Sequence, residues 1–579
     1  MSLNTYRDVA HTNGYEFTQG GGYELPTYPF VPPPELHSQA PARHPIVIVG
    51  GGITGLTLAC SLARLGVKAI LIDEDDTVGV KGASSRGICY TQKSLEIFER
   101  LGVYEPIAAK GTQWSVGRTF AGDDEVYSFD LRQQGSFNLS QQPPFINIQQ
   151  FYIEAFLVDR IQQLGHVELR WRNRLTAFEQ NEQLATLTVE TPAGSYRIEA
   201  EHVIDATGSN SPLRKWLQVP FDSKRGDDRW CIADVRFSTR PPTERHTWIE
   251  APFNENRAVW QHLMADDVWR IDYQMAPNAD PAHVSREDVV RERLARQFGP
   301  EVEVEIVWVG PYAYRSECVH HMRHGRVYFM GDSAKVVSPF GARGGNTGVA
   351  DADNLAWKLA AVLRGQAAPG LLDSYEDERL EAARENVRVT NRTARFLRPA
   401  EGIERVYRDA AIALAKRHPF ARALVNTGRM AVANPYTQSR IVQYAPGSAA
   451  GQSVQNVAFR WANGQAGRMN QLLDWAGGEL LLLCFGALDA PALRRLREVL
   501  ATTPLRAVQV PAGRAPAQAS EHVRDPQGHL RGACGLAEGD EPAWALVRPD
   551  GYLAASGGAI DGRLVQAIGL TLGLTGVHA

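Results

Sequence analysis

The chain has 579 residues, with 61 Lys or Arg against 65 Asp or Glu, so its formal net charge is −4. This near-neutral charge argues against nucleic acid or an anionic membrane as the main partner. A content of 44% hydrophobic and 22% charged residues argues against a disordered or fibrous chain, and the length predicts about three to five domains, or fewer large ones.

The cysteines are scattered, and no two of them form a Cys-x-x-Cys pair. This spacing argues against a disulfide framework, a structural zinc site and a dithiol redox centre. The N-terminal sequence MSLNTYRDVA lacks the basic start and apolar core of a signal peptide. No apolar run approaches the roughly 18 residues that a membrane helix needs. We therefore expect a cytoplasmic protein with no metal site and no membrane span.

Residues 1–44 have no helical or strand period, but they contain four tyrosines, a Gly20–Gly22 cluster and Pro32–Pro34. Two interpretations remain open for this stretch: an extended arm that lies across the folded body, and a loose tail.

A strand–helix–strand unit follows, and its first turn carries a glycine motif. The predicted strand Ile46–Val49 leads into Gly50-x-Gly52-x-x-Gly55, and a second predicted strand, Ala69–Ile72, ends at Asp73. In such a turn the first glycine allows the tight bend, the second lets a pyrophosphate approach, and the third lets helix and strand pack closely. An acid at the position of Asp73 accepts hydrogen bonds from ribose hydroxyls. The unit therefore predicts binding of a dinucleotide at a helix N-terminus.

Further elements follow in order along the chain. The spacing predicts a helix over Gln150–Leu164 and short strands between 167 and 206. β-Branched and aromatic runs between 230 and 274 predict an antiparallel sheet. A buried strand, Val327–Met330, is followed by a long helix from about Thr347 to Leu363.

The loop between those last two elements forms a second motif. Gly331-Asp332 follows the strand directly, and a Pro-Gly loop then leads to a helix that starts near Asn346. The N–H groups of Gly345 and Asn346 at this junction can face an electron-rich ligand atom, and Asp332 can hold a chain of hydroxyl groups.

Together these motifs resemble the FAD-dependent aromatic hydroxylases, the single-component flavoprotein monooxygenases related to para-hydroxybenzoate hydroxylase and phenol hydroxylase. The resemblance implies FAD as cofactor, NAD(P)H as co-substrate, and hydroxylation of a phenolic or related aromatic compound by oxygen added at the flavin C4a position. It also implies Pro339 as a loop residue near the substrate hydroxyl. The cofactor-binding residues that it implies are Gly50, Gly52, Ile53, Thr54, Gly55, Asp73, Glu74, Arg86, Gln150 (followed by Glu154), Gly331, Asp332, Gly344, Gly345 and Asn346.

Two positions depart from the family pattern. Thr207 stands where the middle motif usually has an acid, so the handling of a pyrophosphate there is open. Lys335 stands where the Gly-Asp motif commonly ends in His, so a cation is kept without titration near neutral pH.

The predicted fold class is α/β, with a Rossmann-type FAD-binding domain, an interleaved antiparallel substrate sheet and a C-terminal thioredoxin-like domain. The last of these rests on the phrase LVRPDGYLA (Leu546–Ala554), which is similar to one in larger phenol hydroxylases. Without a Cys-x-x-Cys pair, we expect no thiol chemistry there. The predicted divisions are an arm over 1–44, the FAD-binding domain over 45–400 with the sheet inserted at about 220–320, a helical connection and linker over 401–465, and the thioredoxin-like domain over 466–579.

The substrate needs a flat apolar pocket and a group that removes a phenol proton. Tyr273 and His262 are the candidate catalytic residues, and Gln261, Tyr273 and Pro339 the candidate substrate contacts. Arg257 or Arg270 could anchor a carboxylate. Trp260, Trp269 and Trp308 are interpreted as core.

Several alternatives remain open at this stage. The chain could hydroxylate or epoxidise a polyketide-like ring, or it could be a non-catalytic FAD-bound scaffold; a flavin halogenase is disfavoured because the Trp-x-Trp-x-Ile-Pro signature is absent. The sequence does not identify the ring, the position of hydroxylation, NADH or NADPH, or the oligomeric state, a homodimer included.

Overall fold

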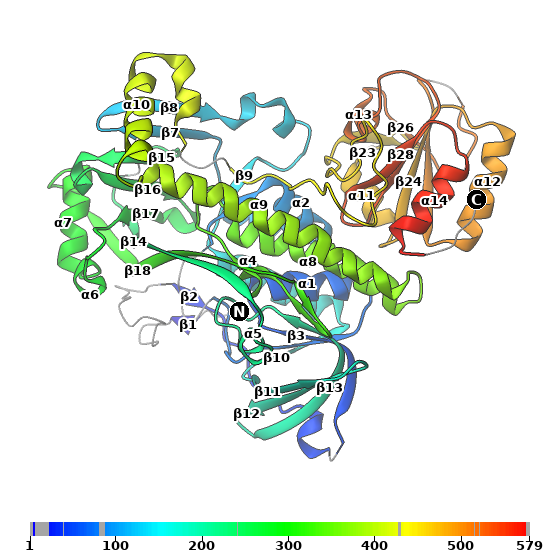
Figure 1. Cartoon of the computed structure of the whole chain (residues 1–579), viewed down its shortest axis with the longest axis horizontal. Helices are drawn as coiled ribbons and strands as arrows, with labels where there is room; N and C mark the ends of the chain where they lie inside the picture. Colours follow the sequence, from blue (N-terminus) through cyan, green and yellow to red (C-terminus); the bar gives the residue numbers. More distant parts are fainter. Residues whose placement is uncertain are drawn as a thin grey trace.

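The computed structural model describes residues 4–5, 23–38, 40–79, 87–239, 241–426, 430–513, 516–519 and 521–574. Figure 1 shows three regions: a mixed sheet with a parallel core at the bottom, an antiparallel sheet at the upper left, and a C-terminal region in orange and red at the right. Two long helices, α8 (Gly344–Leu363) and α9 (Asp373–Leu397), run between them.

The first sheet has the order β10-β4-β3-β13-β12-β11, and β20 pairs with β13. The pairs β10/β4, β4/β3, β3/β13 and β13/β20 are parallel, so the carboxyl ends of these strands meet at one edge, as in Rossmann-type folds. The bounds are β3 Ala42–Val49, β4 Ala69–Ile72, β10 Val167–Arg170, β11 Arg174–Gln180, β12 Ala185–Thr191, β13 Gly194–Asp205 and β20 Val327–Phe329.

Two helices predicted from the sequence lie on this sheet. Helix α1 (Ile53–Arg64) is buried from Ile53 to Ala63 because α4 (Gln150–Leu164) and α8 both contact it. Its sequence can therefore be apolar on nearly every side. The bounds of α4 and of β4 are those that the sequence predicts, whereas α8 begins a few residues before the expected Thr347.

The second sheet has the order β21-β18-β14-β17-β16-β15-β7-β8. Its bounds are β7 Val116–Ala121, β8 Asp124–Asp130, β14 Phe221–Phe237, β15 Arg245–Ala251, β16 Arg257–Leu263, β17 Trp269–Gln274, β18 Val304–Val319 and β21 Lys335–Val336. The strands expected between 230 and 274 are present, and the antiparallel prediction holds for their pairs. The upstream hairpin β7–β8 joins the same sheet through a parallel pair with β15, a long-range contact that the sequence pattern did not predict.

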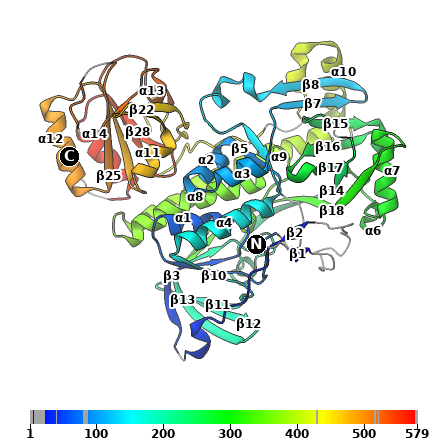
Figure 2. The same cartoon turned by 180° about the vertical axis from the view of Figure 1, so that it is seen from behind.

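The two faces of this sheet have different neighbours. Helix α7 (Glu287–Phe298) covers one face, where Val290 and Leu294 pack into a core with alternate residues of the strands. On the other face, Phe340 from the loop before α8 packs against Trp230 and Trp260. Helix α10 (Ile403–Arg417) lies beside β8, as the reverse view in Figure 2 shows.

The C-terminal region contains a four-stranded sheet of order β25-β24-β27-β28, in which only β24/β25 is parallel. Helices on both faces complete a thioredoxin-like arrangement. Its elements are α11 Met469–Trp475, β24 Leu480–Phe485, α12 Ala490–Thr502, β25 Leu505–Val510, α13 His529–Ala533, β27 Ala543–Val547, β28 Leu553–Gly557 and α14 Gly562–Thr571. Cys484 and Cys534 are both buried, and burial raises the pKa of each thiol to about 12, so neither thiolate forms near neutral pH.

Two stretches without periodic pattern are nevertheless packed. In the N-terminal stretch, the ring of Tyr28 stacks on Trp171 with centroids 4.5 Å apart. In the stretch from 430 to 457, Tyr436 and Ile441 are buried. Irregular segments of this kind are fixed by single anchors, which leave no period in the sequence.

Candidate functional site

The turn between β3 and α1 has the shape that its glycines predict. Gly50 has φ +110°, and a Cβ there would lie 2.5 Å from the carbonyl oxygen of Ala206. A Cβ on Gly55 would lie 2.0 Å from the carbonyl oxygen of Gly50, whereas one on Gly52 would meet nothing closer than Glu154 at 4.0 Å. Two of the glycines therefore serve packing, and the third leaves the N-terminus of α1 open to a phosphate group.

Asp73 ends β4 beside this turn. The N–H groups of Gly51 and Asp75 both donate to its carboxylate. Burial raises the pKa of Asp73 to about 7, although these two donors pull it the other way. The next residue, Glu74, is exposed. Asp73 is thus a half-buried acceptor at the place where an adenosine ribose would lie.

Gln150 and Glu154 lie on the first turns of α4. Gln150 Nε2 donates to Glu154 Oε1 at 2.8 Å, and the N–H of Gly79 donates to Glu154 Oε2 at 2.8 Å. A Cβ on Gly87 would lie 2.4 Å from Gln150 Oε1. The pair therefore contacts Gly79 and lies close to Gly87; Arg86 falls between them, outside the described residues.

The Gly331-Asp332 motif is fixed from two sides. The N–H of Gly331 donates to Asp351 Oδ2 at 3.0 Å, and a Cβ on Gly331 would lie 2.6 Å from Thr54 Oγ1. Asp332 is exposed, while the departing residue Lys335 is buried and pairs with Asp351. Lys335 thus forms a buried ion pair with helix α8, to which Asp351 belongs.

Helix α8 starts at Gly344, so Gly344, Gly345 and Asn346 form its first turn. The N–H groups of a first helical turn have no partner within the helix. The Asn346 side chain fixes this turn, because it donates to the carbonyl of Cys89 at 2.8 Å and accepts from the N–H of Thr91 at 2.9 Å. The glycine turn, Asp73 and this helix start together fit FAD.

The second departure, Thr207, lies in a turn organised by a buried acid. Thr207 Oγ1 donates to Asp205 Oδ1 at 2.6 Å, and Ser211 Oγ donates to the other carboxylate oxygen. An acid, Asp205, therefore stands at the end of β13, two residues before Thr207. Its carboxylate oxygens accept hydrogen bonds within the turn.

The substrate candidates on β16 and β17 are divided between the two faces of the sheet. Gln297 of α7 donates to Gln261 Oε1 at 3.1 Å and accepts from the Tyr273 hydroxyl at 2.7 Å. Gln261 and Tyr273 therefore point towards α7. Because successive strand residues alternate, His262 points to the other face, the one that Phe340 covers.

Pro339 lies in the loop that carries Phe340 to this second face. The Phe340 ring lies 5.1 Å from Trp260 and 5.8 Å from Tyr314, between centroids. Trp230 stacks on Trp260 at 4.5 Å. These rings pack into one buried aromatic cluster, which gives this face of the sheet an apolar wall.

A row of polar residues crosses the same face. Register pairs His262 with Arg270 and Arg270 with Asp234 on adjacent strands, and Arg245 lies close enough to lower the pKa of His262. Burial is the main cause of that decrease, which places the pKa of His262 well below its usual value and leaves the imidazole neutral. Arg257, by contrast, pairs with Glu255 at the sheet margin.

Several buried donors on this face have no hydrogen-bond partner among the described residues. Arg270 Nε donates to Asp272 at 2.9 Å, but its Nη1 is unpaired. The other unpaired atoms are Arg245 Nε, His262 Nδ1, Trp230 Nε1, Trp260 Nε1 and Trp308 Nε1. An unpaired buried polar group costs about 1–3 kcal/mol, so water or another polar ligand is expected to supply the partners of this cluster.

A narrow hollow lies next to this row. Its lining includes Trp114, Asn147, Arg245 and His262. Asn147 ends strand β9 (Phe145–Asn147), three residues before Gln150. The row therefore faces the segment that leads into α4. Period-2 alternation could have separated His262 from Gln261, whereas Arg245 gave no sequence signal.

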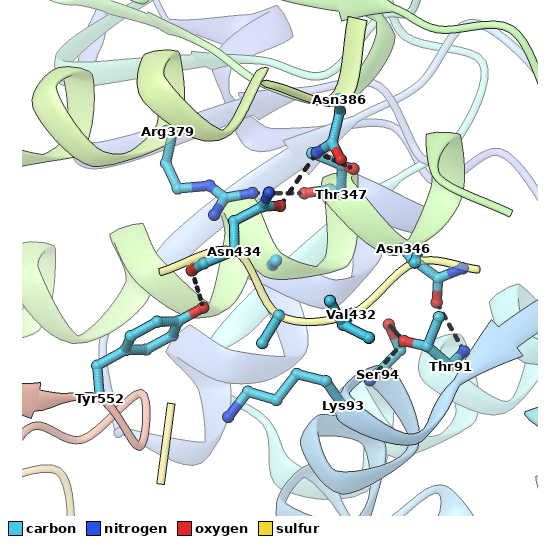
Figure 3. A pocket seen from close by; sticks show the side chains of 13 residues that line it. Thr91, Lys93, Ser94, Asn346, Thr347, Arg379, Asn386, Val432, Asn434 and Tyr552 are labelled. Carbon is cyan, nitrogen blue, oxygen red and sulfur yellow. Dashed lines mark hydrogen bonds between the residues drawn. The ribbon is translucent and has the colours of Figure 1, made fainter. Parts of the chain in front are cut away.

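A second cavity lies behind the first turn of α8, where Lys93, Arg379, Asn434 and Tyr552 come together (Figure 3). Its volume is about 30 Å³, enough for one or two waters but not for an aromatic ring. Tyr552 comes from the C-terminal region, so the cavity marks the junction between that region and α8.

Within the described ranges, no group of three His, Cys, Asp or Glu side chains is arranged to hold a metal ion. Among the helices of that part of the chain, none combines the length and apolarity needed to cross a bilayer.

The sequence profile of the family described as FAD binding domain matches residues 43–390. The chain is 27% identical over 374 residues to a 3-(3-hydroxy-phenyl)propionate/3-hydroxycinnamic acid hydroxylase of Mycolicibacterium smegmatis, a match that covers 64% of this chain and 65% of that protein. It is 24% identical over 534 residues to the Klebsiella pneumoniae protein of the same name, covering 90% and 93%. A crystal structure of the flavin-dependent monooxygenase PieE with FAD and substrate has a TM-score of 0.77 at 23% identity, covering 92% of this chain and 100% of that one.

Proposed function

Because the chain belongs to the FAD-binding class A flavin monooxygenases, a family of aromatic hydroxylases, we propose that it hydroxylates a phenolic compound that carries a carboxylate, with NAD(P)H as reductant. The observation that carries this proposal is the row of unpaired buried donors on the loop-facing side of the antiparallel sheet. The relatives named for 3-(3-hydroxy-phenyl)propionate act on a compound of this class.

The residues around the glycine turn, Asp73, Gly331-Asp332 and the start of α8 would hold FAD. When bound and reduced by NAD(P)H, FAD would activate molecular oxygen, of which one atom enters the ring and the other leaves as water. The first turn of α8 would favour negative charge on a flavin pyrimidine bound there, because its N–H groups have no partner within the helix and the helix dipole is positive at this end.

The sheet residues would hold and orient the substrate. Arg270 Nη1, with Arg245 beside His262, supplies donors for the carboxylate. The neutral His262 can accept the proton of the phenol hydroxyl, and the wall formed by Trp230, Trp260 and Phe340 excludes water from the ring. In this proposal Pro339 lies near the substrate, while Gln261 and Tyr273 support the sheet from the α7 side.

A panel of phenols tests the proposal. Each hydroxyphenyl acid is paired with its amide, and hydroxylated product is measured against NAD(P)H consumed, because uncoupled oxidation yields only peroxide. We expect coupled turnover of at least one acid and a kcat/KM at least tenfold lower for its amide. Arg270→Gln should remove most of that difference. Equal turnover of acids and amides would contradict the carboxylate part of the proposal.

A second candidate is a larger polyketide-like ring. The stacked pair Trp230–Trp260, with Tyr314 tilted against Trp230, makes an aromatic surface wider than one phenol needs. Coupled hydroxylation of a fused-ring phenol without a carboxylate, at a rate above that of every simple acid, would favour this second candidate.

A further inference from the structure

We propose that Tyr23 is a specificity-determining residue of the substrate site: it holds the Asp234 carboxylate, so that the neighbouring Arg270 stays available for a substrate carboxylate. Tyr23 lies before residue 43, where the family match begins. The inference rests on the proposed function, because it concerns the same arginine.

The Tyr23 side chain reaches the middle of the antiparallel sheet. It is 3% exposed, and its hydroxyl donates to Asp234 Oδ2 at 2.7 Å. Its ring meets Phe151 edge-on, with centroids 5.0 Å apart, and Gln149 Nε2 donates to its hydroxyl at 3.4 Å. Gln149 and Phe151 flank Gln150, so Tyr23 lies between the start of α4 and the sheet.

Burial, and then the Asp234 carboxylate, raises the pKa of Tyr23 well above its usual value. The hydroxyl therefore keeps its proton and remains a donor at every physiological pH. A permanent donor is needed if the contact with Asp234 is to persist.

The Asp234 carboxylate can compete with a substrate carboxylate for Arg270. It lies opposite Arg270 in the β14/β17 pair, and opposed residues of an antiparallel pair have Cβ atoms about 4.5–5.5 Å apart. Arg270 already uses Nε on Asp272, while Nη1 is unpaired. An Asp234 without its tyrosine could turn to this Nη1 and occupy the place that the substrate carboxylate needs.

The stretch that carries Tyr23 has its own anchors. Thr77 Oγ1 donates to the carbonyl of Pro26 at 2.6 Å, and Arg170 donates to Glu35 at 3.0 Å. Tyr28 stacks on Trp171, yet its hydroxyl has no hydrogen-bond partner among the described residues. These contacts hold the stretch in place independently of Tyr23, and Tyr28 offers a matched control.

The test uses the FAD-loaded full chain and two probes, 3-(3-hydroxyphenyl)propionate and its primary amide. Binding is followed by the change in flavin absorbance. In Tyr23→Phe we expect the preference for the acid over the amide to fall about five- to tenfold, with amide binding within twofold of the wild type. Tyr28→Phe removes a hydroxyl from the same stretch and should leave the preference unchanged.

A double variant separates this role from a merely structural one. If Tyr23 acts by holding Asp234, then Asp234→Asn removes the competing charge, and Tyr23→Phe combined with Asp234→Asn should regain the preference for the acid. A wild-type preference that Tyr23→Phe retains would overturn the Tyr23 inference alone, as would a loss that the double variant does not restore. Equal binding of acid and amide in the wild type, or binding of neither, would overturn the carboxylate proposal and this inference together.

Discussion

Two buried polar clusters differ in one respect: the charged groups at the junction between α9 and the C-terminal region have hydrogen-bond partners, whereas several groups in the row on the antiparallel sheet have none among the described residues. At the junction, Arg548 donates to Glu378 at 3.0 Å and to Asp550 at 3.0 Å. Lys358 donates to the same Glu378 at 2.7 Å. On the sheet, Arg270 Nη1, His262 Nδ1 and Trp260 Nε1 lack partners among the described residues.

Burial of polar groups has different consequences in the two clusters. Removing one member of a paired buried cluster destabilises the fold strongly, because its partners are left buried without compensation. An unpaired buried donor lowers the stability of the ligand-free protein and is retained where a ligand supplies the partner. In the phrase LVRPDGYLA, Arg548 thus joins the C-terminal region to α9, whereas the sheet row is the site that we propose for the substrate.

The largest expected effect comes from breaking the paired cluster. Arg548→Met leaves Glu378 and Asp550 buried without their main partner and should cost about 3–5 kcal/mol of unfolding free energy, measured by urea denaturation of the FAD-loaded protein. Arg440→Met is the matched control, because Arg440 pairs at the surface with Asp377, the residue next to Glu378 on α9. This exposed pair should contribute at most about 1 kcal/mol, and equal losses in both variants would contradict the comparison.

The paired cluster also predicts that the protein loses stability at acid pH. Burial alone would raise the pKa of Glu378, but Arg548 and Lys358 lower it below its ordinary value. The stability that this carboxylate contributes is therefore fully present above its ordinary pKa and is lost as the pH falls below it.

The next effect comes from the unpaired row. His262→Phe removes a buried donor that has no partner, so the unfolding free energy should stay the same or rise. The rate of hydroxylation, kcat, should fall about 10²- to 10⁴-fold if His262 accepts the phenol proton. Urea denaturation measures the unfolding free energy, and coupled product formation measures kcat. A loss of stability with unchanged kcat would mean that His262 supports the fold and does not accept the phenol proton.

Asp73 is an intermediate case, because main-chain donors only partly offset its burial, and its pKa is about 7. Ribose hydroxyls donate to the ionised carboxylate, so below pH 7 binding of FAD must expel a proton. FAD affinity should therefore rise between pH 6 and pH 8, by up to about tenfold. Fluorescence titration of the FAD-free protein measures this slope, and Asp73→Asn should flatten it.

The sequence predicted the local elements better than the contacts between them. Helix α4 and strand β4 were predicted to the residue, because an amphipathic or apolar period reports directly on burial. The hairpin β7–β8 was not assigned to the sheet, since its partner β15 lies far along the chain and leaves no local trace. The same limit hid Tyr23, a single anchor in an irregular segment.

At the candidate site, the glycine turn and the helix start could be predicted because each residue type there answers a backbone requirement, such as the positive φ of Gly50. The substrate side could not be predicted in the same way. Gln261 and His262 are adjacent in a strand, so only one of them can face the loop that carries Phe340. Which of the two does so depends on the face where α7 packs.

The smallest expected effect isolates hydrogen bonding from packing. Trp544 of the C-terminal region and Trp260 of the sheet are both buried, but Trp544 Nε1 donates to the carbonyl of Ala559 at 2.9 Å, whereas Trp260 Nε1 is unpaired. Trp→Phe at either position removes the same volume, so the loss from packing is similar, and only Trp544→Phe also leaves a carbonyl without its donor. Trp544→Phe should therefore be about 1 kcal/mol more destabilising than Trp260→Phe in urea denaturation. A larger loss at Trp260 would mean that its N–H already has a partner, and the sheet row would then belong with the paired cluster.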